Sequence, residues 1–178
     1  MASTEPQPQA GGAMAQALMA HFEQEMAGTR RALERVPFDK ADWAPHEKSM
    51  TLGRLACHIA EMPGWGGSIL ESDEFDMNPL EGEPYKSPEI KSTEELLAMF
   101  DSGVAAAKAK LPTMSDEAMM SNWRLLSGGE EVFGGPRGSV FNNMIISHTI
   151  HHRGQLTVYL RLNGVPVPAL YGPSADEQ

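Results

Sequence analysis

Cysteine, aromatic residues and basic clusters are all scarce in this chain. One cysteine, Cys57, among 178 residues excludes an internal disulfide framework, and a cytoplasmic location is the default expectation. The net charge is −10, with no run of basic residues longer than Arg30-Arg31, which disfavours binding to nucleic acid or to an anionic membrane surface. No apolar run approaches the roughly 20 residues that span a bilayer. The N-terminus lacks the basic and apolar regions of a secretory signal.

The pattern of apolar residues and helix caps predicts one helical domain. Residues 1–12 are rich in Pro, Gln, Ala and Gly, so we expect a disordered tail followed by a domain over residues 13–178. Apolar residues then recur at the spacing of one helical face. Thr51 and Ser139 are plausible N-caps, and Ser92 begins a capping box. The four predicted long helices span residues 14–36, 52–70, 92–110 and 139–162.

The connections between these helices are long. Residues 73–91 are acidic and proline-rich, which predicts an exposed loop, and residues 113–138 contain a turn-like Ser127-Gly128-Gly129 that is compatible with a short hairpin. Pro63 should weaken or kink the second helix without ending it. We therefore predict an all-α four-helix bundle with a long irregular or hairpin-like connection before the last helix.

Two histidines lie one turn apart on the last predicted helix. His148 and His152 share a stripe with Met144, Leu156 and Tyr159, so both imidazoles should face the core. Burial disfavours charged imidazoles, and two neutral rings one turn apart form a bidentate metal site. A chance pair of core histidines is the alternative that the spacing alone leaves open.

His58 strengthens the metal hypothesis. It lies between Leu55 and Met62 on the second predicted helix, and a facing helix can bring a third imidazole to a two-histidine site. Three protein nitrogens leave a position for water or substrate, which is typical of a catalytic site and suits Zn, Ni, Fe or Cu. Glu61 could act as a carboxylate ligand, orient a ligand imidazole or face solvent.

The remaining histidines and the cysteine have weaker claims. His151 points away from the stripe that carries His152 and is expected at the boundary of the site. His21 and His46 have no partner at ligand spacing, so surface or capping roles are expected. Cys57 lies about 100° around the helix from its neighbour His58, and we interpret it as a buried inert thiol.

These motifs resemble the DinB/YfiT-like superfamily of metalloenzymes, over about residues 14–175. The resemblance is carried by Thr51 to Glu61, by the run from His148 to Leu156 with its His-x-x-x-His-Arg-Gly-Gln pattern, and by the tail from Asn163 to Ala175. It implies a four-helix bundle, a homodimer, and one divalent ion, Zn or Ni with Fe as a further option. The ligands that it implies are His58, His148 and His152.

Several relatives in this superfamily are transferases that use a low-molecular-weight thiol, so the resemblance implies a metal-dependent S-transferase with a small-molecule substrate. Arg153 is expected either to hold a carboxylate of the cosubstrate or to form a surface ion pair. Gln155 is expected to hydrogen-bond near the site or to cap a loop. Two alternatives stay open: a metal-dependent hydrolase, and a non-catalytic protein that binds a metal or sequesters a ligand.

Overall fold

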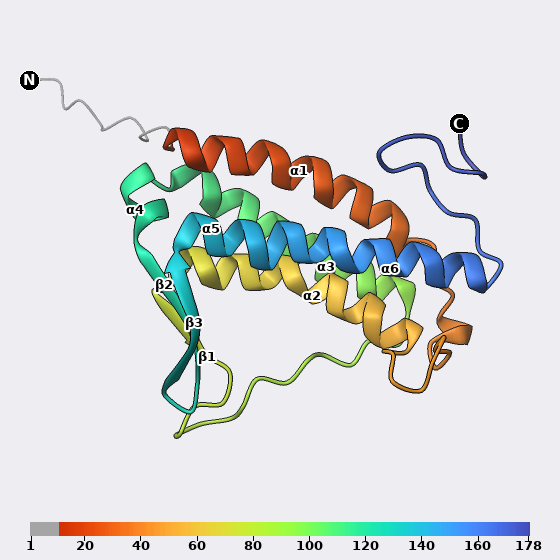
Figure 1. The fold of residues 1–178 in the computed structure, drawn as a ribbon, viewed down its shortest axis with the longest axis horizontal. Coiled ribbons are helices and arrows are strands. Elements are labelled where there is room, and N and C mark those ends of the chain that lie inside the picture. The colour runs from red at the N-terminus through yellow and green to blue at the C-terminus, as the bar shows by residue number, and fades with distance from the viewer. Residues whose placement is uncertain (1–10) are drawn as a thin grey trace, which may run out of the picture.

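Long helices form most of the structure, a computed structural model that describes residues 11–178 (Figure 1). The predicted disordered tail therefore lies outside the described residues except for Gly11 and Gly12. The helices are α1 (Ala13–Leu33), η1 (Phe38–Lys40), α2 (Leu52–Glu71), α3 (Thr93–Lys110), η2 (Leu111–Thr113), α4 (Asp116–Met120), α5 (Arg137–Phe141), the π-helix η3 (Asn142–Ser147) and α6 (His148–Leu162). The strands are β1 (Glu74–Asp76), β2 (Asn122–Ser127) and β3 (Glu130–Pro136).

The core lies between the long helices. α2 packs along α3 and also contacts α6, while α1 contacts both α3 and α6. Phe22, Phe100 and Phe141 are the largest fully buried side chains, and burying each contributes roughly 1.5–3 kcal/mol. None of the helices within residues 11–178 is long and apolar enough to cross a membrane.

Pro63 lies inside α2, which continues to Glu71 as predicted. The neighbouring helix approaches very closely at this point: a Cβ added to Gly103 of α3 would lie 2.5 Å from the backbone nitrogen of Gly64. Tight packing against α3 therefore supports α2 where the proline removes a backbone hydrogen bond.

A three-stranded sheet at one end of the helices corrects the all-α prediction in part (Figure 1). β2 pairs with β3 antiparallel and with β1 parallel, and Phe75 lies opposite Leu125. β1 also corrects the prediction of a loop throughout residues 73–91. It has only three residues and its partner lies about 50 positions later, so local periodicity carries no signal for it.

The hairpin between β2 and β3 confirms the turn suggested by the sequence. Gly128 and Gly129 both have positive φ angles, 65° and 80°, which is the backbone of a two-residue type I′ turn and which glycine adopts without strain. The carboxylate of Asp76 accepts hydrogen bonds from both backbone N–H groups, at 3.1 and 2.7 Å. β1 is thereby fastened to the tip of the hairpin.

The last helical segment begins earlier than predicted, at Arg137 with Pro136 before it, so Ser139 is not its cap. The Arg137 guanidinium is buried and donates to the carbonyls of Ile69 and Ser72 at the end of α2. This anchor starts the helix two residues upstream of the serine. At the other end, Gly164 has φ 72°, which confirms the predicted left-handed stop after α6.

Candidate metal centre

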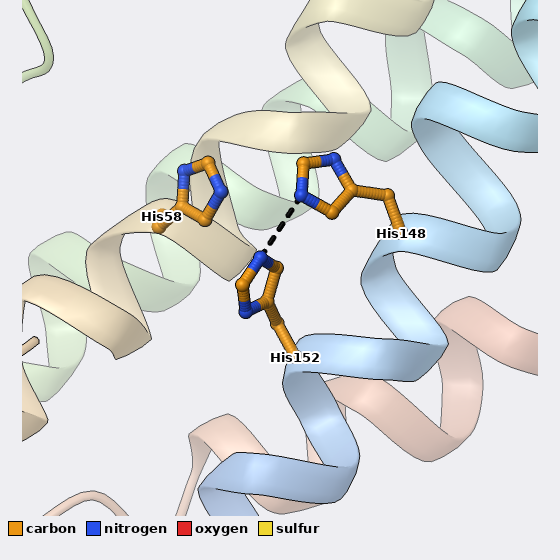
Figure 2. A group of neighbouring side chains, drawn as sticks. All are labelled: His58, His148 and His152. Atoms are coloured by element: carbon orange, nitrogen blue, oxygen red, sulfur yellow. Dashed lines mark hydrogen bonds between the residues drawn. The ribbon is translucent and has the colours of Figure 1, made fainter. Parts of the chain in front are cut away.

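Three imidazoles meet between α2 and α6 (Figure 2). His58 comes from α2, while His148 and His152 come from α6, and one nitrogen of each ring lies within 4.8 Å of the other two. The Nε2 atoms of His148 and His152 are 2.9 Å apart. In a tetrahedral zinc site, nitrogens bonded at about 2.05 Å lie about 3.4 Å from each other. Shifts of an ångström or so would therefore let the three rings share one ion.

The π-helix directly precedes this pair of histidines. Ile145 and Ile146 within it are both fully buried, and α6 begins in regular α-helical geometry at His148. Such π segments within α-helices occur frequently at functional sites. A π turn contains more residues than an α turn, so it rotates the residues that follow it, here His148 and His152, relative to the helix before it.

Glu61 holds His58 from the side. Its Oε1 atom lies 3.0 Å from Nδ1 of His58, so a proton on Nδ1 leaves the Nε2 lone pair free for an ion. The carboxylate is 4% exposed and also accepts hydrogen bonds from Tyr85 at 2.9 Å and from Ser87 and Arg54 at 3.3 Å. Of the three roles expected for Glu61, this contact corresponds to orienting an imidazole.

The Glu61 carboxyl is kept ionised by these partners. Burial alone would raise its pKa, but hydrogen bonds from His58, Tyr85 and Ser87 and the nearby Arg54 charge more than offset this, and the pKa is lowered from its ordinary value. Glu61 does not join the group of three candidate ligands within residues 11–178. An ionised Glu61 is an acceptor only, which favours the Nδ1–H tautomer of His58.

Gln155 contacts His152 in the way that Glu61 contacts His58. Its Oε1 atom lies 2.7 Å from Nδ1 of His152, and its Nε2 atom lies 3.2 Å from Nε2 of His151. The expectation that Gln155 hydrogen-bonds near the site is therefore met. His151 is exposed and stands outside the group of three, as the helical stripe predicts.

His148 differs because its Nδ1 atom is buried and has no hydrogen-bond partner among the described residues. Burial, followed by repulsion from His152 and His58, lowers the pKa of His148 to about 4. Burial also lowers the pKa of His152. Both rings are therefore neutral near pH 7, and neutral imidazole is the form that binds a metal.

Arg153 forms an ion pair, as one of its two expected roles has it, but the pair is buried and does not lie at the surface. Its guanidinium is buried and donates to the Glu25 carboxylate and to the Tyr171 hydroxyl, both at 2.7 Å. Thr29 accepts a further hydrogen bond at 3.2 Å. Arg153 therefore joins α6 to α1 and to the C-terminal segment, and its hydrogen bonds within residues 11–178 go to these elements.

The other weak candidates stay apart from the three histidines. His21 is half-exposed and lies 3.8 Å from Glu25, and His46 accepts a local backbone hydrogen bond at 3.1 Å. Cys57 is buried and donates to the Pro88 carbonyl. Burial, with a smaller effect from Glu61, raises the pKa of its thiol, in keeping with an inert cysteine.

Sequence reasoning missed several residues around the site, chiefly Tyr85 and Trp65. Tyr85 belongs to the segment interpreted as an exposed loop, yet its hydroxyl donates to Glu61 and accepts from Trp65 Nε1 at 3.0 Å. The Trp65 ring lies edge-on to His58, with centroids 5.5 Å apart. The apolar residues of this segment, among them Phe75, Met77 and Tyr85, were the signal that could have indicated a contact with the helices.

A partly enclosed cavity of about 210 Å³ lies beside the histidines. His148 forms part of its wall, as do Trp65 and Tyr85, and the remaining wall comes from α2, the sheet and η3. The arrangement thus combines neutral nitrogen donors with an adjacent apolar space, which is the usual composition of a small-molecule site.

Comparison with known proteins finds relatives that agree with one another in family. The model of the DinB family matches residues 12–178. The uncharacterised protein YrdA of Bacillus subtilis (strain 168) is 28% identical over 157 residues, which cover 88% of this chain and 87% of YrdA. Among solved structures, a DinB-like protein from Bacillus cereus ATCC 10987 has a TM-score of 0.66 at 23% identity, covering 88% of this chain and 97% of the other. The DinB-like protein YjoA of Bacillus subtilis has a TM-score of 0.59 at 21% identity, covering 84% and 95%.

The two similar structures support the fold. The family model matches nearly the whole described chain, and the structure brings the three histidines together; both findings support the resemblance found in the sequence. The chain therefore belongs to the DinB family.

Proposed function

We propose that this protein is a metal-dependent enzyme that binds one divalent ion, Zn or Ni in preference to Fe, through His58, His148 and His152. The observation that carries the proposal is the convergence of three imidazole nitrogens within 4.8 Å of one another. No carboxylate or thiolate joins them within residues 11–178. Three neutral nitrogens leave at least one coordination position for an exogenous group, as in catalytic rather than structural sites.

We assign a reaction class from the same donor set: the transfer of a small thiol to an electrophilic carbon. The thiol loses its proton to solvent, its sulfur forms a bond to the carbon, and the bond from that carbon to its leaving group breaks, the leaving group (chloride, for an alkyl chloride) departing with the electron pair. When bound, a divalent ion supplies Lewis-acid chemistry that lowers the pKa of a thiol or water and so provides a nucleophile near neutral pH. Three neutral ligands leave the double charge of the ion uncompensated, which favours an anionic fourth ligand. The buried Cys57, whose thiol pKa is raised, is unsuited to that role, so the thiol comes from a cosubstrate.

The surrounding residues have distinct roles in this proposal. Glu61 and Gln155 accept from Nδ1 of His58 and His152, at 3.0 and 2.7 Å, and thereby orient both rings. Such outer contacts change metal affinity or activity by 10–100-fold in other metal sites. Tyr85 and Trp65 cover the side of the site nearest the cavity.

A hydrolase is the second candidate, since water could take the place of the thiol. A non-catalytic metal-binding or ligand-sequestering protein is the third. The cavity beside His148 favours an enzyme or a ligand-sequestering protein over one that only holds an ion, because a site that serves only to hold an ion needs no adjoining space for a second molecule.

The test is a turnover screen with protein purified without chelators or metal-affinity resin. Several cellular thiols are combined with a panel of alkyl and aryl electrophiles, and product is measured for metal-loaded protein, metal-free protein and the His148→Ala variant. His151→Ala is the matched control on the same helix. Thiol-dependent turnover by metal-loaded protein and by His151→Ala alone supports the transferase. Metal-dependent turnover without thiol supports the hydrolase, and no turnover with stoichiometric metal supports the binding protein.

We further propose a cytoplasmic homodimer, following the family resemblance. The sequence places Met119 and Met120 outside the four predicted long helices, where apolar residues could contact a partner. Met119 is fully buried in the core, so of these two methionines Met120, at 57% exposed, is the one available to a partner. Light scattering at micromolar concentration should give twice the chain mass of 19.4 kDa, and a monomer mass would contradict the dimer.

A further inference from the structure

We propose that the cavity beside His148 binds the apolar body of the electrophilic substrate, an aromatic ring or branched hydrocarbon of about that size, with its reactive end toward the three histidines. This inference rests on the proposed function, because it names the class of molecule that the enzyme would transform. The cavity is formed where α2, the sheet and η3 meet, and six side chains from these elements define it: Trp65, Ile69, Phe75, Trp123, Phe133 and Met144.

The size of the cavity suits a small ring. Its volume is about 210 Å³, whereas an engineered apolar cavity of about 150 Å³ already binds benzene. The wall includes Met77 and Met144, whose flexible side chains can adjust to ligands of different shape. A substituted benzene or a branched chain of similar bulk therefore fits without rearrangement of the helices.

The chemistry of the wall selects against charge. Apart from His148, which is neutral near pH 7, none of the described residues that line the cavity is acidic or basic. The Tyr85 hydroxyl is already engaged with Glu61 and Trp65. A charged group placed here would lose its hydration and could gain only the few polar atoms of the wall, chiefly the Ser68 hydroxyl, Trp123 Nε1 and His148 Nδ1, which is unfavourable by several kcal/mol. An apolar body instead gains free energy from leaving water.

The position of the cavity links it to the proposed ion. His148 is both a candidate ligand and part of the cavity wall. Trp65, on another part of the wall, lies edge-on to His58. A molecule held by its apolar end in this space consequently presents its other end to the histidines. Such positioning through a remote, unreactive group is a general source of rate enhancement.

Iodobenzene is a direct probe, with 4-iodobenzoate as its charged counterpart. Trp65 and Trp123 line the cavity, whereas Trp43 packs against Tyr159 away from it, so iodine in the cavity should quench most of the tryptophan fluorescence of a Trp43→Phe variant. We expect saturable quenching by iodobenzene at one site per chain and at least about tenfold weaker binding of 4-iodobenzoate. Equal binding of the two compounds, or no saturable quenching, would overturn the proposal.

Ser68→Phe, on the cavity wall, should fill the space and weaken iodobenzene binding at least about tenfold. The matched control is Val132→Phe, because Val132 is 56% exposed on β3 and does not line the cavity. Unchanged binding by folded Ser68→Phe would contradict the assignment. If that variant does not fold, wild-type crystals soaked with iodobenzene provide the test through the anomalous diffraction of iodine. Iodine located between Trp65 and Trp123 supports the proposal, and iodine located elsewhere refutes it.

The binding assay needs neither thiol nor turnover, so the two proposals fail separately. Iodobenzene binding without metal-dependent turnover would refute the enzyme and leave an apolar binding site. Thiol-dependent turnover without iodobenzene binding would refute the cavity assignment alone. If both hold, benzyl chloride should be a substrate with a KM at least about tenfold below that of 4-(chloromethyl)benzoate, and Ser68→Phe should raise the KM for benzyl chloride.

Discussion

Replacing Arg153 by Met should destabilise the protein severely while leaving its metal content intact. Arg153 and Glu25 are each 2% exposed and are joined at 2.7 Å, so the variant leaves the Glu25 carboxylate buried without its counter-charge. Breaking a buried pair in this way costs about 3–5 kcal/mol. The whole free energy of unfolding of a typical domain is about 5–15 kcal/mol, so the loss should be a large fraction of it.

The assay is thermal unfolding followed by circular dichroism. For a chain of this size, each kcal/mol shifts the midpoint by about 2–4 °C, which predicts a fall of about 6–20 °C for Arg153→Met. Arg161→Met is the matched control, because Arg161 lies on the same helix and its pair with Asp176 is 49% exposed on the arginine side. An exposed pair contributes at most about 1 kcal/mol, so the control should unfold within a few degrees of wild type.

A double-mutant cycle separates the pair from its surroundings. Glu25→Leu combined with Arg153→Met leaves no unpaired charge, so the double variant should be more stable than the sum of the single losses predicts. Additive losses would refute the coupling that the structure shows between these residues. An Arg153→Met variant that unfolds with wild type but binds cosubstrate poorly would instead restore the role expected from the sequence.

Further predictions concern the histidines. His152→Ala should abolish stoichiometric metal binding and His151→Ala should leave it largely intact, as measured by elemental analysis; the reverse result would contradict the assignment of the helical face. Glu61→Gln should weaken metal binding about 10–100-fold. Tyr85→Phe should weaken it less, because the Glu61 carboxylate keeps its contact with the His58 imidazole. Metal affinities of the two variants equal to that of wild type, measured in competition with a chromophoric chelator, would refute this. Because the pKa of His148 is lowered to about 4 in the folded protein and is near 6.5 in the unfolded chain, the unfolded chain binds more protons between these values. Metal-free protein should therefore lose stability as pH falls from 6.5 to 4, by less than about 3 kcal/mol because the ring is half-buried; urea unfolding that shows the same loss in His148→Leu would contradict this origin.

Helical periodicity and capping explain why much of the fold could be predicted. The serine and glutamate that begin α3 are three apart, and the glycine after α6 needs only its own backbone. The three-stranded sheet depends instead on pairing between β1 and β2, about 50 positions apart, and β1 is too short for an alternating pattern. Ser139 resembled a cap because nothing local indicates that Arg137 is buried against the end of α2.

The candidate site also has a part that the sequence could predict and a part that it could not. His148 and His152 could be paired because a four-residue spacing fixes their shared face, and His58 because it lies on an apolar face of its own helix. The roles of Arg153 and Tyr85 could not be predicted, because their partners lie far away in the chain: Glu25 on α1 for the arginine, and Glu61 on α2 for the tyrosine. A polar side chain, whether on a helix or in a loop, gives no local sign of which distant group it contacts.

Metal content tests the central claim most directly. Elemental analysis of protein purified without chelators or metal-affinity resin should find about one divalent ion per chain, and His58→Ala, His148→Ala and His152→Ala should each reduce this to a small fraction, because each removes one of three ligands. Circular dichroism would confirm that the variants remain folded. Two results would contradict a three-histidine metal centre. One is wild-type protein that contains no metal and takes up neither Zn nor Ni on titration. The other is that all three histidine variants fold and keep the metal content of wild type.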